Sequence, residues 1–225
     1  MKSEVFNADC MEVMALYPDK YFDLAVVDVP YGICAASKEF MRVGIKRGNS
    51  KAIGGLYKVS DWDSSVPDGK YWNELFRVSQ NQIIWGANHF ISMVPNDSSC
   101  WIVWDKENGN NGYADCELAY TSFGTAVRRF RFKWHGMLQQ DMKNKEQRIH
   151  PTQKPVALYD WIYKNYLPNG GRVIDTHLGS GSNRIAADKA GNIEFTACEI
   201  DKDYFDAQER RYKDYKAQGN LFRAA

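Results

Sequence analysis

Apolar and polar positions near the N-terminus alternate between strand-like and helix-like patterns. Residues 2–6 form a short strand candidate. Residues 9–12 read Asp-Cys-Met-Glu, which fits a capping box before a helix with apolar positions on one face. Residues 23–28 (DLAVVD) are apolar without alternation. This pattern is typical of a parallel strand that is covered on both faces.

The C-terminal third repeats this alternation with clearer boundaries. Pro155 opens an amphipathic helix, and Asn-Gly-Gly ends it. After it we expect, in order, a strand at 172–176, a glycine-rich turn, a helix at 182–190, a strand at 194–198 and a helix at 204–215. Strands and helices that alternate in this way predict an α/β protein with a doubly wound, mostly parallel sheet.

The middle of the chain is less regular. Further strands are predicted at 82–85 and 101–104, and sheet edges at 117–122 and 127–132. Residues 34–60 show no periodicity, and we expect them to form a mobile basic loop, because long irregular loops are usually functional or disordered. The last residues, 218–225, are expected to fray.

Composition restricts the class of protein. The chain has 225 residues, of which 44% are hydrophobic, which suits a single domain over 1–225. No apolar run approaches the roughly 20 residues of a membrane span, and the first residues lack a signal-peptide pattern. The five cysteines are scattered and never spaced as CxxC, so neither a disulfide framework nor a metal site is expected. We expect a cytoplasmic protein that makes no contact with a membrane.

Charge is distributed unevenly, although the net charge is only +1. Residues 34–60 carry six Lys or Arg against one Glu, and residues 124–154 carry eight against one Asp and one Glu. Two basic segments on an acidic body favour a surface that contacts phosphates. Solvated loops rich in lysine account for the same counts, so charge alone leaves both interpretations open.

A glycine turn separates the strand at 172–176 from the next helix. Gly179 and Gly181 lie in this turn, and Glu199 ends the following strand, 18 residues after Gly181. A carboxylate at this place in a doubly wound fold accepts hydrogen bonds from ribose hydroxyls. The spacing lacks the third glycine of the dinucleotide fingerprint, and no GKS or GKT is present, which excludes a phosphate-cradling ATPase loop. A nucleoside ligand is favoured, although a tight turn with a solvated Glu also fits.

A second group of residues follows the strand at 23–28. Asp28 stands at its carboxyl end, where open α/β sheets bind ligands. Pro30 restricts Val29 to an extended conformation and so orients the Val29 carbonyl. Two acceptors can thus receive one exocyclic amine, and Tyr31 offers a ring on which a base can stack. In isolation the same residues also fit a plain strand end and turn.

Three motifs occur in the order in which a known family has them: DVPY at 28–31, HPTQKP at 150–155 and LGSG at 178–181. The whole chain resembles the DNA amino-methyltransferases, whose signatures are [D/N/S]PP[Y/F/W] and FxGxG. The segments QIIWGANHF and WDK are also similar to this family. The resemblance implies a Rossmann-like methyltransferase fold with the circularly permuted motif order of the beta group. It also implies a target-recognition insertion at roughly 105–149.

The resemblance implies a role for each matching residue. Asp9 and the Cys10 backbone would bind the adenine of S-adenosylmethionine, and Glu199 its ribose. The methionine part would lie among residues near the turn, which are Asp28, Asp175, Gly179, Ser180, Gly181 and Ser182, with Thr152, Gln153 and Lys154 near its carboxylate. The catalytic group would be Asp28, Val29, Pro30 and Tyr31.

Two positions depart from the family pattern. Val29 replaces a proline, which keeps the carbonyl acceptor but reduces backbone stiffness. Thr176 and His177 replace the usual Pro-Phe. We expect His177 to be structural rather than catalytic.

The sequence therefore predicts methyl transfer from S-adenosylmethionine to the N6 of an adenine flipped out of double-stranded DNA. The expected chemistry is in-line displacement at the sulfonium methyl, and the expected phosphate contacts are Lys46, Arg47, Arg129, Arg131 and Lys133. A homodimer and a cognate restriction endonuclease are expected partners. N4-cytosine methylation, methylation of a protein glutamine or RNA base, and a non-catalytic binding relative are the alternatives. C5-cytosine methylation is disfavoured because no Pro-Cys occurs.

Overall fold

The computed structural model describes residues 2–35, 37, 60–94, 97–109, 114–135 and 138–223, with side chains to residue 218 in the last helix. Most of the basic loop predicted at 34–60 lies outside the described residues, as do Lys46 and Arg47. Within these ranges, no helix combines the length and the apolarity that crossing a bilayer requires.

An eight-stranded sheet organises the described part of the chain, in the order β1-β10-β9-β2-β3-β5-β4-β6. All neighbouring strands are parallel except that β5 runs antiparallel to β3 and β4. The strands are β1 Ser3–Phe6, β2 Phe22–Val27, β3 Ser79–Trp85, β4 Trp101–Asp105, β5 Cys116–Thr121, β6 Arg128–Arg131, β9 Gly171–Asp175 and β10 Ile193–Cys198. A separate two-stranded ladder joins β7 Trp134–His135 to β8 Leu138–Gln139.

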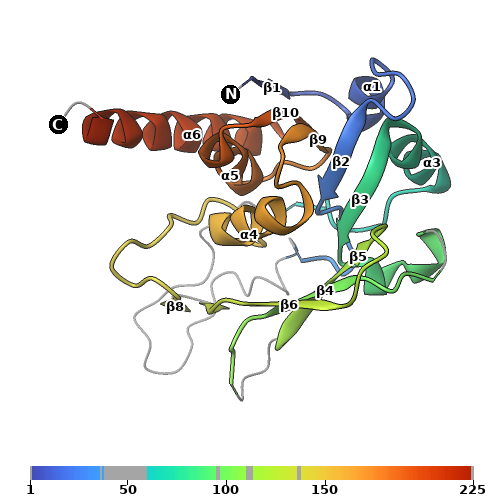
Figure 1. Cartoon of the computed structure of the whole chain (residues 1–225), viewed down its shortest axis with the longest axis horizontal. Coiled ribbons are helices and arrows are strands. Elements are labelled where there is room, and N and C mark those ends of the chain that lie inside the picture. The colour runs from blue at the N-terminus through green and yellow to red at the C-terminus, as the bar shows by residue number, and fades with distance from the viewer. Residues whose placement is uncertain are drawn as a thin grey trace.

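Helices cover both faces of the sheet (Figure 1). The helices of one face are α4 Val156–Tyr166, α5 Ser182–Ala190 and α6 Lys202–Arg223. The other face carries α1 Cys10–Met14 and α3 Gly69–Val78, and two 3-10 turns follow β3, η1 Ala87–His89 and η2 Ile91–Met93. The predicted doubly wound, mostly parallel α/β architecture is confirmed.

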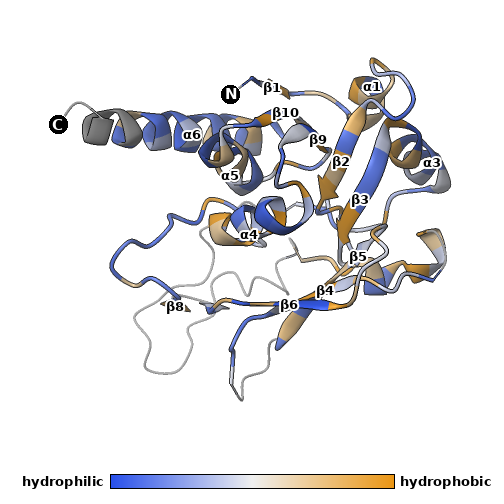
Figure 2. Cartoon of the chain, in the orientation of Figure 1, coloured by the Kyte–Doolittle hydropathy of each residue, from blue (hydrophilic) through white to orange (hydrophobic). Residues whose placement is uncertain are grey.

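Alternate residues of β2 show why both faces must be covered. Leu24 and Val26 pack with α4 and α5, whereas Ala25 and Val27 pack with α3. All four side chains are almost fully buried, so the strand needs apolar residues at every position. In Figure 2, β2 is correspondingly orange along its lower half, whereas α6 is largely blue.

The structure departs from the sequence-based expectation at three places. The segment at 117–122 is not a sheet edge, because β5 lies between β3 and β4; the edge is β6. The helix α3 was not predicted. The last helix does not stop at 215 but continues to Arg223. Its exposed surface is polar, and Lys216 forms an ion pair with Asp188 of α5, which stabilises a turn that apolar periodicity does not reveal.

The order of the strands defines where a ligand binds. From β9 the chain crosses by α5 to β10 on one side, whereas from β2 it crosses by α3 to β3 on the other side. The strand order therefore reverses between β9 and β2. In open α/β sheets, ligands bind at the carboxyl ends of the strands at such a reversal.

Candidate active site

Four acidic residues gather at the carboxyl edge of the sheet. Asp175 ends β9, Asp28 follows β2, Glu199 follows β10, and Asp9 lies shortly after β1. A fifth acidic residue reaches this edge from the opposite direction: because β5 is antiparallel, its second residue, Glu117, lies beside the carboxyl ends of the other strands. Glu117 is not among the site residues predicted from the sequence.

Asp9 begins α1 as its N-cap. Its Oδ1 accepts a hydrogen bond from the Met11 amide at 2.7 Å. Cys10, the first residue of the helix, is half-buried, and burial together with the nearby Asp9 charge raises the pKa of its thiol to about 12. Cys10 is therefore a neutral thiol at physiological pH, and its neighbour supplies a fixed carboxylate.

The glycine turn is held open by left-handed backbone. Gly179 has φ +52° and Gly181 has φ +74°, values that side-chain-bearing residues rarely adopt. Gly181 is also the N-cap of α5 and provides no side-chain cap, so amide groups of the first turn face the site without a side-chain acceptor. Arg211 of α6 fixes the turn by donating to the Ser180 carbonyl at 2.8 Å and to the Ser182 hydroxyl at 2.9 Å.

Two carboxylates border this turn. Glu199 accepts the Gly179 amide at 2.8 Å and the Asp201 amide at 2.9 Å, one on each oxygen. Asp175 accepts the His177 amide at 3.1 Å and the Asn183 side-chain amide at 2.9 Å. Burial raises the pKa of Glu199, and it raises the pKa of Asp175 to about 7. Each carboxylate thus both braces the turn and keeps lone pairs for a ligand.

Lys154 of the HPTQKP segment binds directly to the carboxylate of Asp28, in the loop after β2. Its Nζ lies 2.5 Å from Asp28 Oδ1, 3.1 Å from the Tyr31 hydroxyl and 3.0 Å from Glu117 Oε2. The Tyr31 hydroxyl donates to the same Asp28 oxygen at 2.7 Å. The lysine side chain is only 3% exposed. Residues from three distant parts of the chain therefore form one buried polar cluster.

Opposite charges offset one another in this cluster. Burial acts to raise the pKa of Glu117, but Lys154 and Lys106 outweigh it and lower the pKa to about 2. Burial also raises the pKa of Asp28, and here the Lys154 charge only partly opposes it. For Lys154, the two carboxylates outweigh burial and raise its pKa. The lysine is charged and Glu117 is ionised at neutral pH.

Asp63, which was not predicted from the sequence, holds the loop after β2 through backbone amides. Its buried carboxylate accepts amides from Tyr31 at 2.5 Å, Gly32 at 3.0 Å and Ala35 at 2.8 Å. The Asp63 carbonyl also accepts the Cys34 amide at 2.9 Å. An Asp in a short polar loop gives no sequence signal for this role, because its partners lie about 30 residues away.

Val29 and Tyr31 have closely packed surroundings. The Val29 side chain is 2% exposed and packs in the core beneath α3, while Pro30 is half-buried next to it. The Tyr31 ring stacks on His89, with centroids 5.1 Å apart and planes at 16°. At Gly86, φ is +72° and a Cβ would lie 2.0 Å from Tyr31 Cε1, so only glycine fits beneath this ring.

The HPTQKP segment packs over the glycine turn. The His150 ring contacts Trp62 and Tyr204, at centroid distances of 5.2 and 4.4 Å, and burial lowers its pKa to about 3. Thr152 is exposed and its hydroxyl pairs with His150. The Gln153 side chain accepts the Ile149 amide and donates to the Gln147 carbonyl, and the Gln153 backbone carbonyl accepts the Trp134 indole N–H at 2.7 Å. Gln153 therefore braces its own loop.

His177 occupies a structural position. Its ring meets Tyr71 edge to face at 5.6 Å, and the Thr176 hydroxyl links the two residues, 2.7 Å from the Tyr71 hydroxyl and 2.9 Å from His177 Nδ1. Burial lowers its pKa to about 4, so the ring is neutral at physiological pH.

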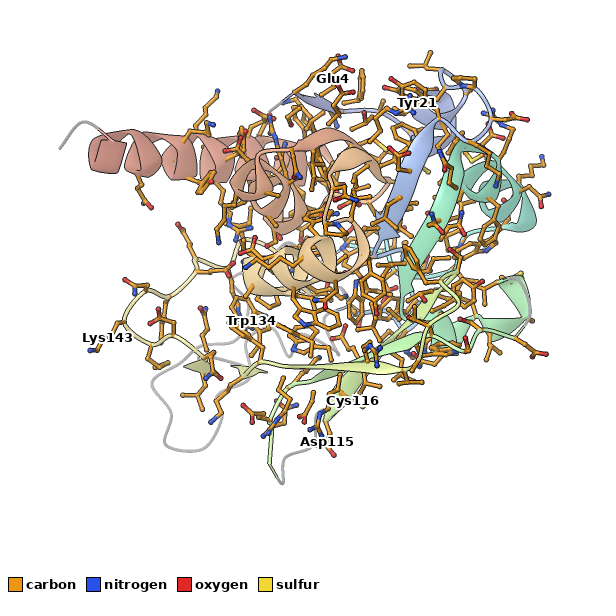
Figure 3. All side chains as sticks on the ribbon, in the orientation of Figure 1. Glu4, Tyr21, Asp115, Cys116, Trp134 and Lys143 are labelled. Carbon is orange, nitrogen blue, oxygen red and sulfur yellow. The ribbon has the colours of Figure 1, made fainter. Side chains whose placement is uncertain are left out.

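The predicted DNA-contacting residues of 128–133 differ in their surroundings. On β6, Phe130 is buried, whereas Arg129 and Arg131 on either side of it are exposed. Arg131 is already paired, 2.5 Å from Glu107 and 3.7 Å from Asp105. Lys133 is half-buried just beyond the strand. Figure 3 places Trp134 beneath α4 and Lys143 at the outer end of the loop between β8 and α4.

Comparison with known proteins gives consistent matches over most of the chain. A family model described as DNA methylase matches residues 58–210. The type II methyltransferase M.ScaI of Streptomyces caespitosus is 24% identical, over 90% of this chain and 78% of that protein. The crystal structure of the M1.HpyAVI-SAM complex is 18% identical with a TM-score of 0.52, over 93% of this chain and 99% of that one. The cytosine-N4-specific PvuII DNA methyltransferase is 10% identical with a TM-score of 0.59, over 94% and 86%.

Proposed function

Since the chain belongs to the DNA methylase family, we propose that it methylates the exocyclic N6 of an adenine flipped out of double-stranded DNA, with S-adenosylmethionine as the methyl donor. One observation carries the proposal: Asp28 and the glycine turn meet where the strand order reverses. The proposed base site and nucleoside site would thus lie next to each other, as methyl transfer between two ligands requires.

The residues on the nucleoside side fit S-adenosylmethionine. Its adenine amine and ribose hydroxyls are donors, and Asp9 and Glu199 are acceptors with lone pairs remaining. Its carboxylate is an anion, and α5 begins at Gly181 without a side-chain cap. Asp175, Ser180 and Ser182 line the same turn. When bound, this cofactor supplies an activated methyl group.

The residues on the base side explain how the amine is made nucleophilic. The nitrogen lone pair of an exocyclic amine is delocalised into the ring. Hydrogen bonds from the NH₂ group to Asp28 and to the Val29 carbonyl would direct that lone pair outward and stabilise the positive charge that develops. Tyr31 and Lys154 both bind Asp28 at Oδ1, so its Oδ2 is the acceptor we assign to the amine.

Adenine is proposed over cytosine because position 28 is Asp rather than Ser. N4-cytosine methylation is the alternative. It is supported by the similarity in fold to PvuII DNA methyltransferase, which is cytosine-N4-specific. A non-catalytic DNA-binding relative is the alternative of another class. A cytoplasmic location, a homodimer and a partner endonuclease stay predictions.

Expression in a host without related methyltransferases tests these proposals. Nucleoside analysis of host DNA should find N6-methyladenine, and sequencing of modified positions would define the recognition site. N4-methylcytosine would replace the proposed target by the alternative. Absence of both, with purified protein also failing to incorporate tritiated methyl groups into DNA, would contradict the proposed enzyme.

A further inference from the structure

We propose that Lys154 and Glu117 form a positioning pair for Asp28: Lys154 holds one oxygen of Asp28 so that the other faces the target amine, and Glu117 holds Lys154. The proposal deepens the proposed function and rests on it. Lys154 would thus serve the methyl acceptor, and not the carboxylate of the cofactor as its motif suggested.

The donor geometry of Lys154 supports this assignment. An ammonium group has three N–H bonds. Lys154 donates hydrogen bonds to Asp28 and Tyr31, and it forms an ion pair with Glu117 at 3.0 Å. All three oxygens lie within 3.1 Å of its Nζ and belong to the base side of the site. Binding a cofactor carboxylate would require Lys154 to give up one of these partners.

The arrangement also fixes the orientation of Asp28. Lys154 and the Tyr31 hydroxyl both bind Oδ1, at 2.5 and 2.7 Å. A carboxylate held twice on one oxygen cannot rotate without breaking two charge-assisted hydrogen bonds. Its Oδ2 is therefore presented in a single direction, as a hydrogen bond to one amine proton requires.

Glu117 reaches this cluster because β5 is antiparallel. It stands opposite Trp104 in the ladder with β4, at the edge of the sheet where β2 and β3 end. Its other ion-pair partner, Lys106, follows β4 and lies over the Trp104 ring. Glu117 is thus anchored on one side by Lys106 and offers the other side to Lys154.

The charges around Asp28 give the pair a measurable signature. The ionisable groups that act on it are Tyr31 in its own loop, Lys154 before α4, Glu117 on β5, Asp175 on β9 and Tyr159 on α4. Lys154 lowers the pKa of Asp28, whereas Glu117 raises it. Removing the lysine and removing the glutamate must therefore move the titration of Asp28 in opposite directions.

The test follows the carboxyl carbon of Asp28 by NMR in protein labelled with ¹³C-aspartate, with Asp28→Asn to assign the signal. The Asp28 midpoint should rise in Lys154→Met and fall in Glu117→Gln. Lys189→Met is the matched control, because it removes a comparable lysine–carboxylate pair, with Asp160, on an exposed surface. It should leave the midpoint unchanged.

Methyl transfer provides the second readout. In Lys154→Met, kcat should fall about tenfold or more, the effect of losing one charge-assisted hydrogen bond, and its acid limb should move to higher pH. In Glu117→Gln the acid limb should move to lower pH. If Lys154→Met does not fold, the Glu117→Gln titration decides alone.

Midpoints that stay fixed, or that move in the same direction in both variants, would overturn the proposal. The titration needs no substrate, so its result is separate from the proposed function. If wild-type protein transfers no methyl group to DNA, the proposed function fails whatever the titration shows.

Discussion

The carboxylate of Asp63 accepts the backbone amide of Tyr31 at 2.5 Å, although the two residues are 32 positions apart. With the amides of Gly32 and Ala35 on the same side chain, three backbone amides of the loop after β2 depend on one buried aspartate. Asp63 therefore holds residues 31–35, which follow β2, against the segment that leads into α3.

Replacing Asp63 should therefore reduce both stability and rate. In Asp63→Asn, one oxygen becomes an NH₂ group that faces backbone donors, and about 1–3 kcal/mol of unfolding free energy should be lost. The rate of methyl transfer should fall further than stability alone explains, because Tyr31 loses its support. Denaturant unfolding and kcat measure the two effects.

Asp68→Asn is the matched control, because Asp68 also accepts backbone amides, those of Lys70 and Tyr71 at the start of α3, outside the catalytic loop. Equal loss of kcat in both variants would contradict a specific role for Asp63.

Asp28→Ala should abolish most methyl transfer. Loss of one preorganised partner for developing charge costs about 10²–10³-fold in rate. The protein should still fold, because Lys154 keeps Glu117 as its ion-pair partner. Incorporation of tritiated methyl groups into DNA gives the rate. The Asp28→Asn variant keeps an oxygen acceptor, so its rate of methyl transfer should fall less. A near wild-type rate in Asp28→Ala would show that the assignment of Asp28 as a catalytic residue is wrong.

Much of the site could be predicted because it follows strand ends. Asp28, Asp175 and Glu199 each stand where an apolar run stops, and such positions share one edge of a parallel sheet. Gly179 and Gly181 were predicted from the backbone geometry that a turn needs, and both have positive φ. These features are local, so the sequence pattern contains them.

Glu117 and Asp63 could not be predicted for the opposite reason. Glu117 reaches the site only because β5 runs antiparallel between β3 and β4, and pairing direction is a property of the whole sheet. Asp63 binds amides that precede it by about 30 residues. Lys154 was predicted to lie near the cofactor carboxylate, whereas its contacts with Asp28, Tyr31 and Glu117 depend on the packing of distant segments, which the sequence pattern does not contain.

Arg129 and Arg131 should differ in their contribution to DNA binding. Arg131 is paired with Glu107 and Asp105, whereas Arg129 is exposed on the same strand. Arg129→Ala should weaken binding and reduce the slope of log affinity against log salt by about one, as expected for one lost phosphate contact. Arg131→Ala should change the slope less. Fluorescence anisotropy over a series of salt concentrations measures both, and equal slopes would contradict the distinction.

The buried Asp175 should make stability depend on pH near neutrality. Its pKa is raised to about 7 in the folded protein from an ordinary value near 3.8, so the folded state binds more protons between those values. Its contribution to stability is complete below about pH 4 and is lost as pH rises through 7. As pH rises from about 4 through 7, the unfolding free energy of the Asp175→Asn variant should therefore fall less than that of the wild-type protein. Parallel curves would show that Asp175 ionises normally.

Val29→Ala should destabilise the protein by about 1–3 kcal/mol, because the Val29 side chain is 2% exposed and packs beneath α3. Val29 is thus an anchor of the catalytic loop as well as a source of one carbonyl. Thermal unfolding measures the loss. A change below about 0.5 kcal/mol, the size seen at surface positions, would mean that the side chain contributes little to packing.

The single reversed strand sets a limit on engineering new recognition sites. Exchanging residues 105–149 between relatives treats that segment as a replaceable cassette. In this chain, exchange of residues 105–149 would replace Lys106, Glu117 and all of β5 and β6. A segment chosen to recognise a new DNA sequence would therefore also replace part of the proposed reaction centre. Grafts that keep β4 to β6 and exchange only the loop between β8 and α4 should preserve turnover more often.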